Sequence, residues 1–106
     1  MNKEEKLEIR FKTKKLEKQY TNHKEAERAF GKDVARKFIQ RIAILKSAKN
    51  FDDLFKISIL KIHPLKGPRE GEFAIKLTGF YRLIITNDGD VFDIAKIEEV
   101  SKHYDD

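Results

Sequence analysis

Basic and imidazole side chains gather in the second half of the sequence, between residues 61 and 82. His63 opens the segment His-Pro-Leu-Lys-Gly, and Lys66 follows three residues later. Arg82 stands among apolar neighbours in Tyr-Arg-Leu-Ile-Ile, where a guanidinium is unusual unless it reaches a cleft or a partner. Lysine and arginine stabilise the negative charge that gathers on the non-bridging oxygens of a reacting phosphodiester. These residue types therefore indicate phosphate chemistry.

Each of these residues also has a structural interpretation. Arg82 could pair with Glu72 or Asp93 across a sheet, and a histidine before proline at a strand end is usually a surface or capping residue. Near the end of the sequence, His103 and Tyr104 could return over a sheet and assist proton transfer, or they could belong to a frayed end. Residue types alone leave these alternatives open.

The composition excludes several classes of protein. The chain has 106 residues and no Pro- or Gly-rich break, so we expect a single domain, 1–106, around one core. It has no cysteine, which excludes disulfides and thiolate metal sites and favours a reducing cytoplasm. No apolar run approaches the length of a membrane span, and the first residues lack the apolar core of a signal peptide. The net charge of +5 favours acidic or polyanionic partners.

Other catalytic and metal-binding patterns are missing from the sequence. No glycine loop ends in Gly-Lys-Ser or Gly-Lys-Thr, and no Gly-x-Ser-x-Gly segment is present. His23, His63 and His103 are too dispersed to predict a metal site. A nucleotide-binding P-loop, a serine hydrolase and a zinc centre are therefore not expected.

The first half of the sequence predicts one strand followed by helices. Apolar and charged residues alternate over 7–11, which predicts a short half-buried strand. Thr13 and Asn22 are predicted N-caps, and Glu25 completes a capping-box pattern with Asn22. After Gly31, apolar residues recur at spacings of three and four, which predicts the core-facing stripe of a long helix. This stripe comprises Val34, Ala35, Phe38, Ile39, Ile42 and Leu45.

The opposite face of this long helix is expected to be basic. It is interpreted as a solvated surface or, alternatively, as a surface that faces RNA. Its residues are Lys32, Arg36, Lys37, Gln40 and Arg41.

The second half of the sequence predicts a sheet, preceded by a short helical turn around residues 51–55. The predicted strands are 57–63, 73–77, 81–86 and 91–97. Thr78-Gly79 could form a two-residue connection and Asp88-Gly89 is a strong hairpin signal, so consecutive strands should be antiparallel. We expect an α+β domain in which the N-terminal strand and helices pack on one face of a mostly antiparallel four-stranded sheet, with the other face free.

The segment from residue 63 to residue 104 resembles the C-terminal half of HigB-type killer proteins of the RelE/ParE toxin superfamily. The strongest elements are His-Pro-Leu-Lys-Gly at 63–67, then Gly71 and Phe73, and Phe-Tyr-Arg-Leu-Ile at 80–84. The predicted strand and helices upstream are compatible with the same RelE-like fold. The resemblance thus covers nearly the whole chain.

The resemblance implies a cytoplasmic toxin of a type II toxin-antitoxin pair, which enters the ribosomal A site, cuts mRNA and is neutralised by a HigA-like helix-turn-helix antitoxin. In such endoribonucleases the 2′-hydroxyl of the RNA attacks the adjacent phosphate without a metal or cofactor. His63 and Lys66 match the active-site loop of the family, and Arg82 matches its strand arginine. His103 and Tyr104 resemble its terminal catalytic residues.

The end of the sequence departs from one common pattern of the family. That pattern closes with Asp-Tyr-His, whereas residues 102–105 here are Lys-His-Tyr-Asp. The resemblance therefore implies that either His63 or His103 transfers protons, with their roles open to exchange. It implies that Tyr104 orients the scissile nucleotide or assists.

The remaining cations are expected to act on the phosphate or to hold RNA. Lys66 and Arg82 would stabilise the pentacoordinate phosphate. The residues interpreted as RNA-binding are Lys61, Arg69 and Lys76. Two alternatives stay open: a ParE-like toxin that inhibits DNA gyrase without needing a histidine, and a non-enzymatic basic module that binds RNA or the ribosome.

Overall fold

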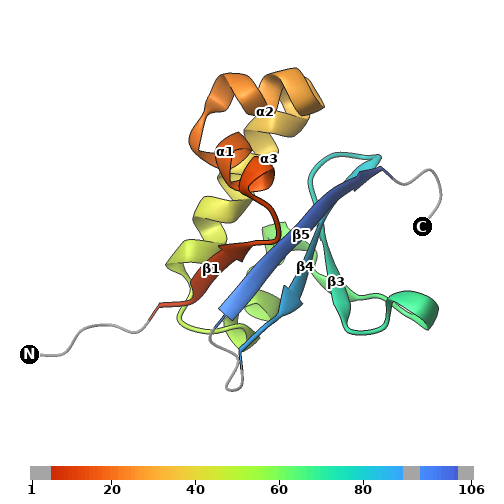
Figure 1. Ribbon diagram of the computed structural model, residues 1–106. Helices are drawn as coiled ribbons and strands as arrows, with labels where there is room; N and C mark the ends of the chain where they lie inside the picture. Colours follow the sequence, from red (N-terminus) through yellow and green to blue (C-terminus); the bar gives the residue numbers. More distant parts are fainter. Residues whose placement is uncertain (1–5, 90–93, 103–106) are drawn as a thin grey trace, which may run out of the picture.

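The computed structural model describes residues 6–89 and 94–102. A five-stranded sheet is accompanied by three α-helices that lie together beside it (Figure 1). In chain order the elements are β1 (Glu8–Phe11), α1 (Lys14–Thr21), α2 (His23–Phe30), α3 (Lys32–Ser47), β2 (His63–Pro64), β3 (Glu72–Lys76), β4 (Tyr81–Asn87) and β5 (Ile94–Lys102). The predicted α+β class is confirmed.

Side-chain caps begin the first two helices at the predicted residues. The hydroxyl oxygen of Thr13 accepts a backbone N–H bond from α1 at 3.1 Å, and the amide oxygen of Asn22 accepts two from α2 at 3.1 and 3.3 Å. The prediction that the Glu25 carboxylate accepts a hydrogen bond from the backbone N–H of Asn22 is wrong. The Glu25 carboxylate accepts from Arg28 at 2.8 Å, while the backbone N–H of Asn22 donates to the carbonyl of Lys18 at 2.8 Å.

Helix α3 supplies the helical side of the core. Gly31 separates it from α2 with a φ of 84°, a left-handed value that favours glycine. The predicted stripe is buried, except that Ile39 is only partly buried. Phe38 is fully buried, and its ring centroid lies 5.2 Å from that of Phe30. In the described ranges, no helix combines the length and apolar character that a membrane crossing requires.

The prediction that Arg41 lies on the solvent side of α3 is wrong. Its side chain is buried, and Nε donates to the backbone carbonyl of Lys76 at 3.2 Å. A second guanidinium nitrogen donates to the amide oxygen of Gln40. The helical period explains the difference, because Phe38, Arg41 and Leu45 follow at spacings of three and four and share the buried face.

The sheet has the strand order β1-β5-β4-β3-β2. Strand β1 runs parallel to β5 at one edge, and the other neighbouring strands are antiparallel. The N-terminal strand is thus a member of the sheet, which therefore has five strands instead of the predicted four. One face joins the core that the helices cover. Its core residues are Ile75, Leu77, Leu83, Ile85, Ala95 and Ile97. None of the three α-helices covers the other face, which we call the open face, and the short 3₁₀ helix Gly67–Arg69 lies in the segment that leads into β3.

The predicted strand 57–63 is wrong over most of its length. One 3₁₀ helix, Asp52–Lys56, ends just before this segment, and a second, Ser58–Leu60, lies within it. Only the last residue of the segment, His63, enters β2. Leu54, Ile57 and Leu60 recur every three residues, and a 3₁₀ helix has three residues per turn. That spacing lets Leu54 and Leu60 be fully buried while Ile57 packs against the core.

The connection between β3 and β4 is longer than the two residues predicted. Residues 77–80 lie between the strands, and the backbone N–H of Leu77 donates to the carbonyl of Tyr81 at 3.0 Å. Lys76 is consequently paired with Arg82. A two-residue turn would have paired residue 77 with residue 80 and shifted the register by one.

Strands β4 and β5 form the predicted antiparallel pair. Strand β5 extends from Ile94 to Lys102, well beyond the predicted end at residue 97. A register shift lies between Ile84 and Ile85, where two residues of β4 face three of β5. The predicted Asp88-Gly89 turn runs into residues 90–93, which lie outside the described residues.

Candidate functional site

Lys76 and Arg82 occupy directly opposed positions on β3 and β4. Both project from the open face, because their neighbours Ile75 and Leu83 point into the core. Like charges directly opposite each other across strands are destabilising. In the described part of the chain, Lys76 forms no ion pair. An anion close to both cations would offset their repulsion, so the sheet register itself creates a candidate phosphate site.

The Arg82 guanidinium bends back over the β3–β4 connection. Its Nη1 donates to the backbone carbonyl of Thr78 at 2.9 Å and to that of Tyr81 at 3.1 Å. These contacts hold the charge at the end of the hairpin. Of the two carboxylates that could have been structural partners, Glu72 is bound by a different arginine, and Asp93 lies outside the described residues.

His63 shares the open face with these cations. In the β2–β3 ladder it pairs with Ala74, which lies two residues from Lys76 on the same face. Its exposed ring has Nδ1 at 3.3 Å from the carbonyl oxygen of Pro64. A carbonyl only accepts hydrogen bonds, so Nδ1 is the donor where this contact is a hydrogen bond, and the second ring nitrogen, Nε2, is the candidate base.

Lys66 lies in the segment between β2 and β3, next to His63 and Pro64 of the sheet edge. Its side chain is exposed, and no ion pair with it occurs within residues 6–89 and 94–102. The preceding residue is tied to the sheet, because the N–H of Leu65 donates to the carbonyl of Glu72 at 2.9 Å. Lys66 is therefore an available cation at the rim of the open face.

Arg69 is placed differently from the other candidate cations. Its Nε lies 2.7 Å from an oxygen of Glu72, and its Nη2 lies 2.5 Å from an oxygen of Glu99. The hydrogen bond to Glu99 is the largest cause that raises the pKa of Arg69 above its ordinary value, and the hydrogen bond to Glu72 adds to it. The interpretation of Arg69 as an RNA contact stays a prediction.

The other predicted site residues are not brought together in the described structure. Lys61 is exposed at a left-handed turn with a φ of 47°. The prediction that Lys61 and His63 share a strand is therefore wrong. His103 and Tyr104 lie outside the described residues. Strand β5 ends at Lys102, which pairs with Tyr81.

The sequence analysis did not identify two residues of β5 that lie on the open face. Ser101 pairs with Arg82, and Glu99 pairs with Ile84. Because the strand was predicted to end at residue 97, neither was considered. The apolar residues Ile97 and Val100, which pack on the helical side, are the signal that could have extended it.

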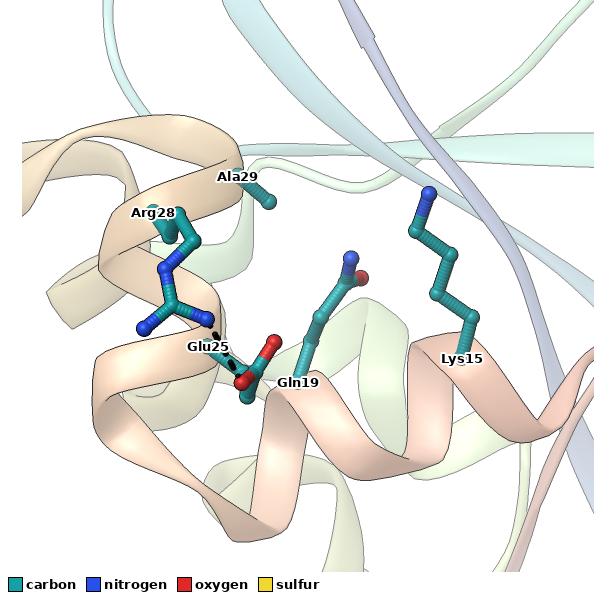
Figure 2. Close-up of a pocket in the computed structure, with 5 residues that line it drawn as sticks. All are labelled: Lys15, Gln19, Glu25, Arg28 and Ala29. Carbon is teal, nitrogen blue, oxygen red and sulfur yellow. Dashed lines mark hydrogen bonds and ion pairs between the residues drawn. The ribbon is translucent and has the colours of Figure 1, made fainter.

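The helical layer has a hollow, and the residues that line it do not include any of the predicted site residues. Figure 2 shows Lys15 and Gln19 of α1 and Glu25 and Arg28 of α2 around this hollow, whose volume is about 190 Å³. The Arg28 guanidinium donates to the Glu25 carboxylate at 2.8 Å.

Segment 14–47 contains ten Lys and Arg residues against four Asp and Glu residues. The net charge is therefore concentrated on the helices, whereas the open face combines cations with carboxylates.

Comparisons with known proteins relate this architecture to bacterial toxins. No protein-family model matches the sequence, and no curated protein does. The YoeB/ParE toxin from Agrobacterium tumefaciens has 16% sequence identity and a TM-score of 0.57, over 92% of this chain and 100% of that chain. The chain has the fold of this toxin. The match confirms the predicted RelE-like architecture at the level of fold.

Two solved complexes contain chains with the same toxin fold. The E. coli DinJ-YafQ toxin-antitoxin complex matches with 18% identity and a TM-score of 0.57, over 92% of each chain. The YoeB-YefM toxin-antitoxin complex from Staphylococcus aureus matches with 20% identity and a TM-score of 0.52, over 92% of this chain and 98% of that chain. The toxin fold therefore recurs at low sequence identity.

Proposed function

We propose that residues 1–106 form a single toxin domain of a type II toxin-antitoxin pair, and that this toxin cleaves mRNA on the ribosome. The observation that carries the proposal is the opposition of Lys76 and Arg82 on the open face of a toxin fold. The HigB-like segment around His63 and Lys66 supports it, because both residues lie at the same face or its rim.

The proposed reaction begins with proton removal from the ribose 2′-hydroxyl by Nε2 of His63. The 2′-oxygen attacks the adjacent phosphorus, the bond from phosphorus to the 5′-oxygen breaks, and a 2′,3′-cyclic phosphate forms. The leaving 5′-oxygen takes a proton and becomes a hydroxyl. His103 is the alternative or complementary proton donor, and Tyr104 orients the nucleotide.

Cations of the open face stabilise the pentacoordinate phosphate. Lys66, Lys76 and Arg82 supply positive charge that interacts more strongly with the transition state than with the substrate. Lys61, Arg69 and Lys76 are the residues proposed to hold RNA. No step in this scheme draws on a metal or cofactor.

The proposed partners follow from the same assignment. The toxin would act in the cytoplasm on mRNA in the ribosomal A site. A HigA-like helix-turn-helix antitoxin would neutralise it. The presence of antitoxins in the DinJ-YafQ and YoeB-YefM complexes supports a partner of this class.

Cleavage on translating ribosomes tests the proposal. The purified chain is added to a translation reaction, and new mRNA ends are mapped by primer extension. We expect cuts with the wild type and with Arg28→Gln, a control on the helical layer, and none with the Lys76→Ala/Arg82→Ala double variant. Uncut mRNA at concentrations that saturate the ribosome would refute the nuclease and leave a binding module.

A gyrase-directed toxin is the second candidate, since one similar fold is that of a YoeB/ParE toxin. Such a toxin would not need an imidazole. The His63→Ala/His103→Ala double variant separates the two functions in cells. Growth arrest that persists together with altered plasmid supercoiling would favour gyrase, whereas loss of arrest and of mRNA cuts would favour the nuclease.

A further inference from the structure

Arg69 connects two strands that are not neighbours in the sheet. Glu72 belongs to β3 and Glu99 to β5, and β4 runs between them. A guanidinium within 2.7 Å of one carboxylate and 2.5 Å of the other must therefore span β4. We call this arrangement the Arg69 bridge.

The burial of the open face beneath this position fits a side chain lying across it. Ile84 of β4 pairs with both Ala74 and Glu99, so it lies between the two strands that carry the carboxylates. Ile84 is 0% exposed and Ala74 is 2% exposed, although both lie on the face that the helices do not cover. The side chain of Arg69 itself is 36% exposed, which places the bridge at the surface of the site.

The bridge also closes one end of the segment that carries Lys66. At the other end, His63 and Pro64 are held in the β2–β3 ladder. Between Pro64 and Glu72, Gly67 and Gly71 have φ values of 67° and 100°, left-handed conformations that glycine adopts at little cost. The Arg69 bridge adds a side-chain anchor between these two glycines, beyond Lys66.

We propose that Arg69 is a positioning residue, which holds the 63–71 segment over the sheet through Glu72 and Glu99. This inference rests on the proposed nuclease function and changes the role expected of Arg69, which would act through carboxylates instead of contacting RNA phosphate. The bridge also neutralises much of the charge of two carboxylates that would otherwise repel the substrate.

The two roles predict opposite effects of Glu99→Gln. If Arg69 contacted phosphate, removing the competing carboxylate would strengthen RNA binding, while Arg69→Gln would weaken it. If Arg69 positions the segment, both substitutions break the same bridge. Each should then lower kcat for mRNA cleavage by roughly 10- to 100-fold with little change in KM.

A double-mutant cycle tests this prediction. We expect the Arg69→Gln/Glu99→Gln variant to lose no more activity than either single variant, because residues in one network do not act additively. Arg28→Gln removes an arginine from another ion pair and should leave kcat unchanged. Additive losses, or tighter RNA binding by Glu99→Gln, would overturn the positioning role.

Amide hydrogen exchange tests the bridge without any nuclease activity. The N–H groups of Leu65 and Glu70 donate to carbonyls within the segment and its strand, at 2.9 and 3.0 Å. We expect their exchange to be faster by roughly fivefold in Arg69→Gln and Glu99→Gln, at unchanged global stability, and unaltered in Arg28→Gln. Unchanged exchange would refute the bridge as an anchor. Failure of wild-type cleavage alone would refute only the nuclease.

Discussion

The guanidinium of Arg41 is buried and donates through Nε to the backbone carbonyl of Lys76 at 3.2 Å. This hydrogen bond joins helix α3 to β3 at Lys76, whose side chain is a candidate phosphate ligand. In the described ranges, no carboxylate pairs with Arg41, and burial lowers its pKa from the ordinary value. The buried charge is held by neutral oxygen acceptors, so its removal should have two opposing effects on stability.

We expect Arg41→Ala to lower the free energy of unfolding by about 2–3 kcal/mol, because it leaves both a void and a carbonyl without its side-chain donor. Arg41→Met should cost about 1 kcal/mol or less, since it fills the space and removes the desolvated charge. Urea unfolding measures both. A larger loss for Arg41→Met than for Arg41→Ala would contradict this account of the site.

Arg82→Ala should affect the chemical step more than binding to the ribosome. Arg82 is paired with Lys76, and in the proposed reaction their positive charges stabilise the negative charge that the phosphate gains in the transition state. We expect kcat for mRNA cleavage to fall by roughly 10²-fold or more, with ribosome binding changed by less than about threefold. Single-turnover cleavage and ribosome pelleting measure the two quantities. Equal losses in both would exclude a transition-state role.

His63→Ala should lower cleavage by roughly 10²- to 10⁴-fold if Nε2 is the base. His63→Gln is the matched polar control, because it can form hydrogen bonds but cannot accept a proton near neutral pH. Single-turnover cleavage compares both variants with the wild type. If both retain the wild-type rate while His103→Ala loses activity, the base is His103 instead.

Asn22→Ala should destabilise the junction of α1 and α2. The side chain of Asn22 accepts from the backbone N–H groups of Lys24 and Glu25, and alanine leaves both without this acceptor. We expect a loss of about 1 kcal/mol in the free energy of unfolding, and little change for Asn22→Asp, which keeps the acceptor. Thermal and urea unfolding of the three proteins provide the measurement, and equal stability of all three would disprove the cap.

Local patterns in the sequence predicted local structure well. The caps at Thr13 and Asn22 and the buried stripe around Phe38 depend on residues within two or three helical turns of one another. Their side-chain chemistry decides them without long-range contacts. The same patterns were ambiguous around Ile57, where alternation and a period of three both fit and the core selected the second.

Contacts between distant residues could not be predicted in this way. Strand β1 pairs with β5 across more than eighty residues of sequence, and Arg69 reaches Glu99 thirty residues later. Arg41 is buried because β3 supplies a carbonyl to its side chain. Each of these partners is chosen by the assembled sheet, and no local pattern of residues identifies it.

Lys76 and Arg82 show where this division falls in the candidate site. Sequence alone determined that cations lie on consecutive antiparallel strands and that apolar residues flank them. A two-residue turn would have placed Arg82 opposite Ile75, whose side chain faces the core. A one-residue change of register moves a strand residue to the other face. Only the tertiary structure decided the longer connection, because packing Leu83 and Ile85 into the core requires the register that opposes the two cations.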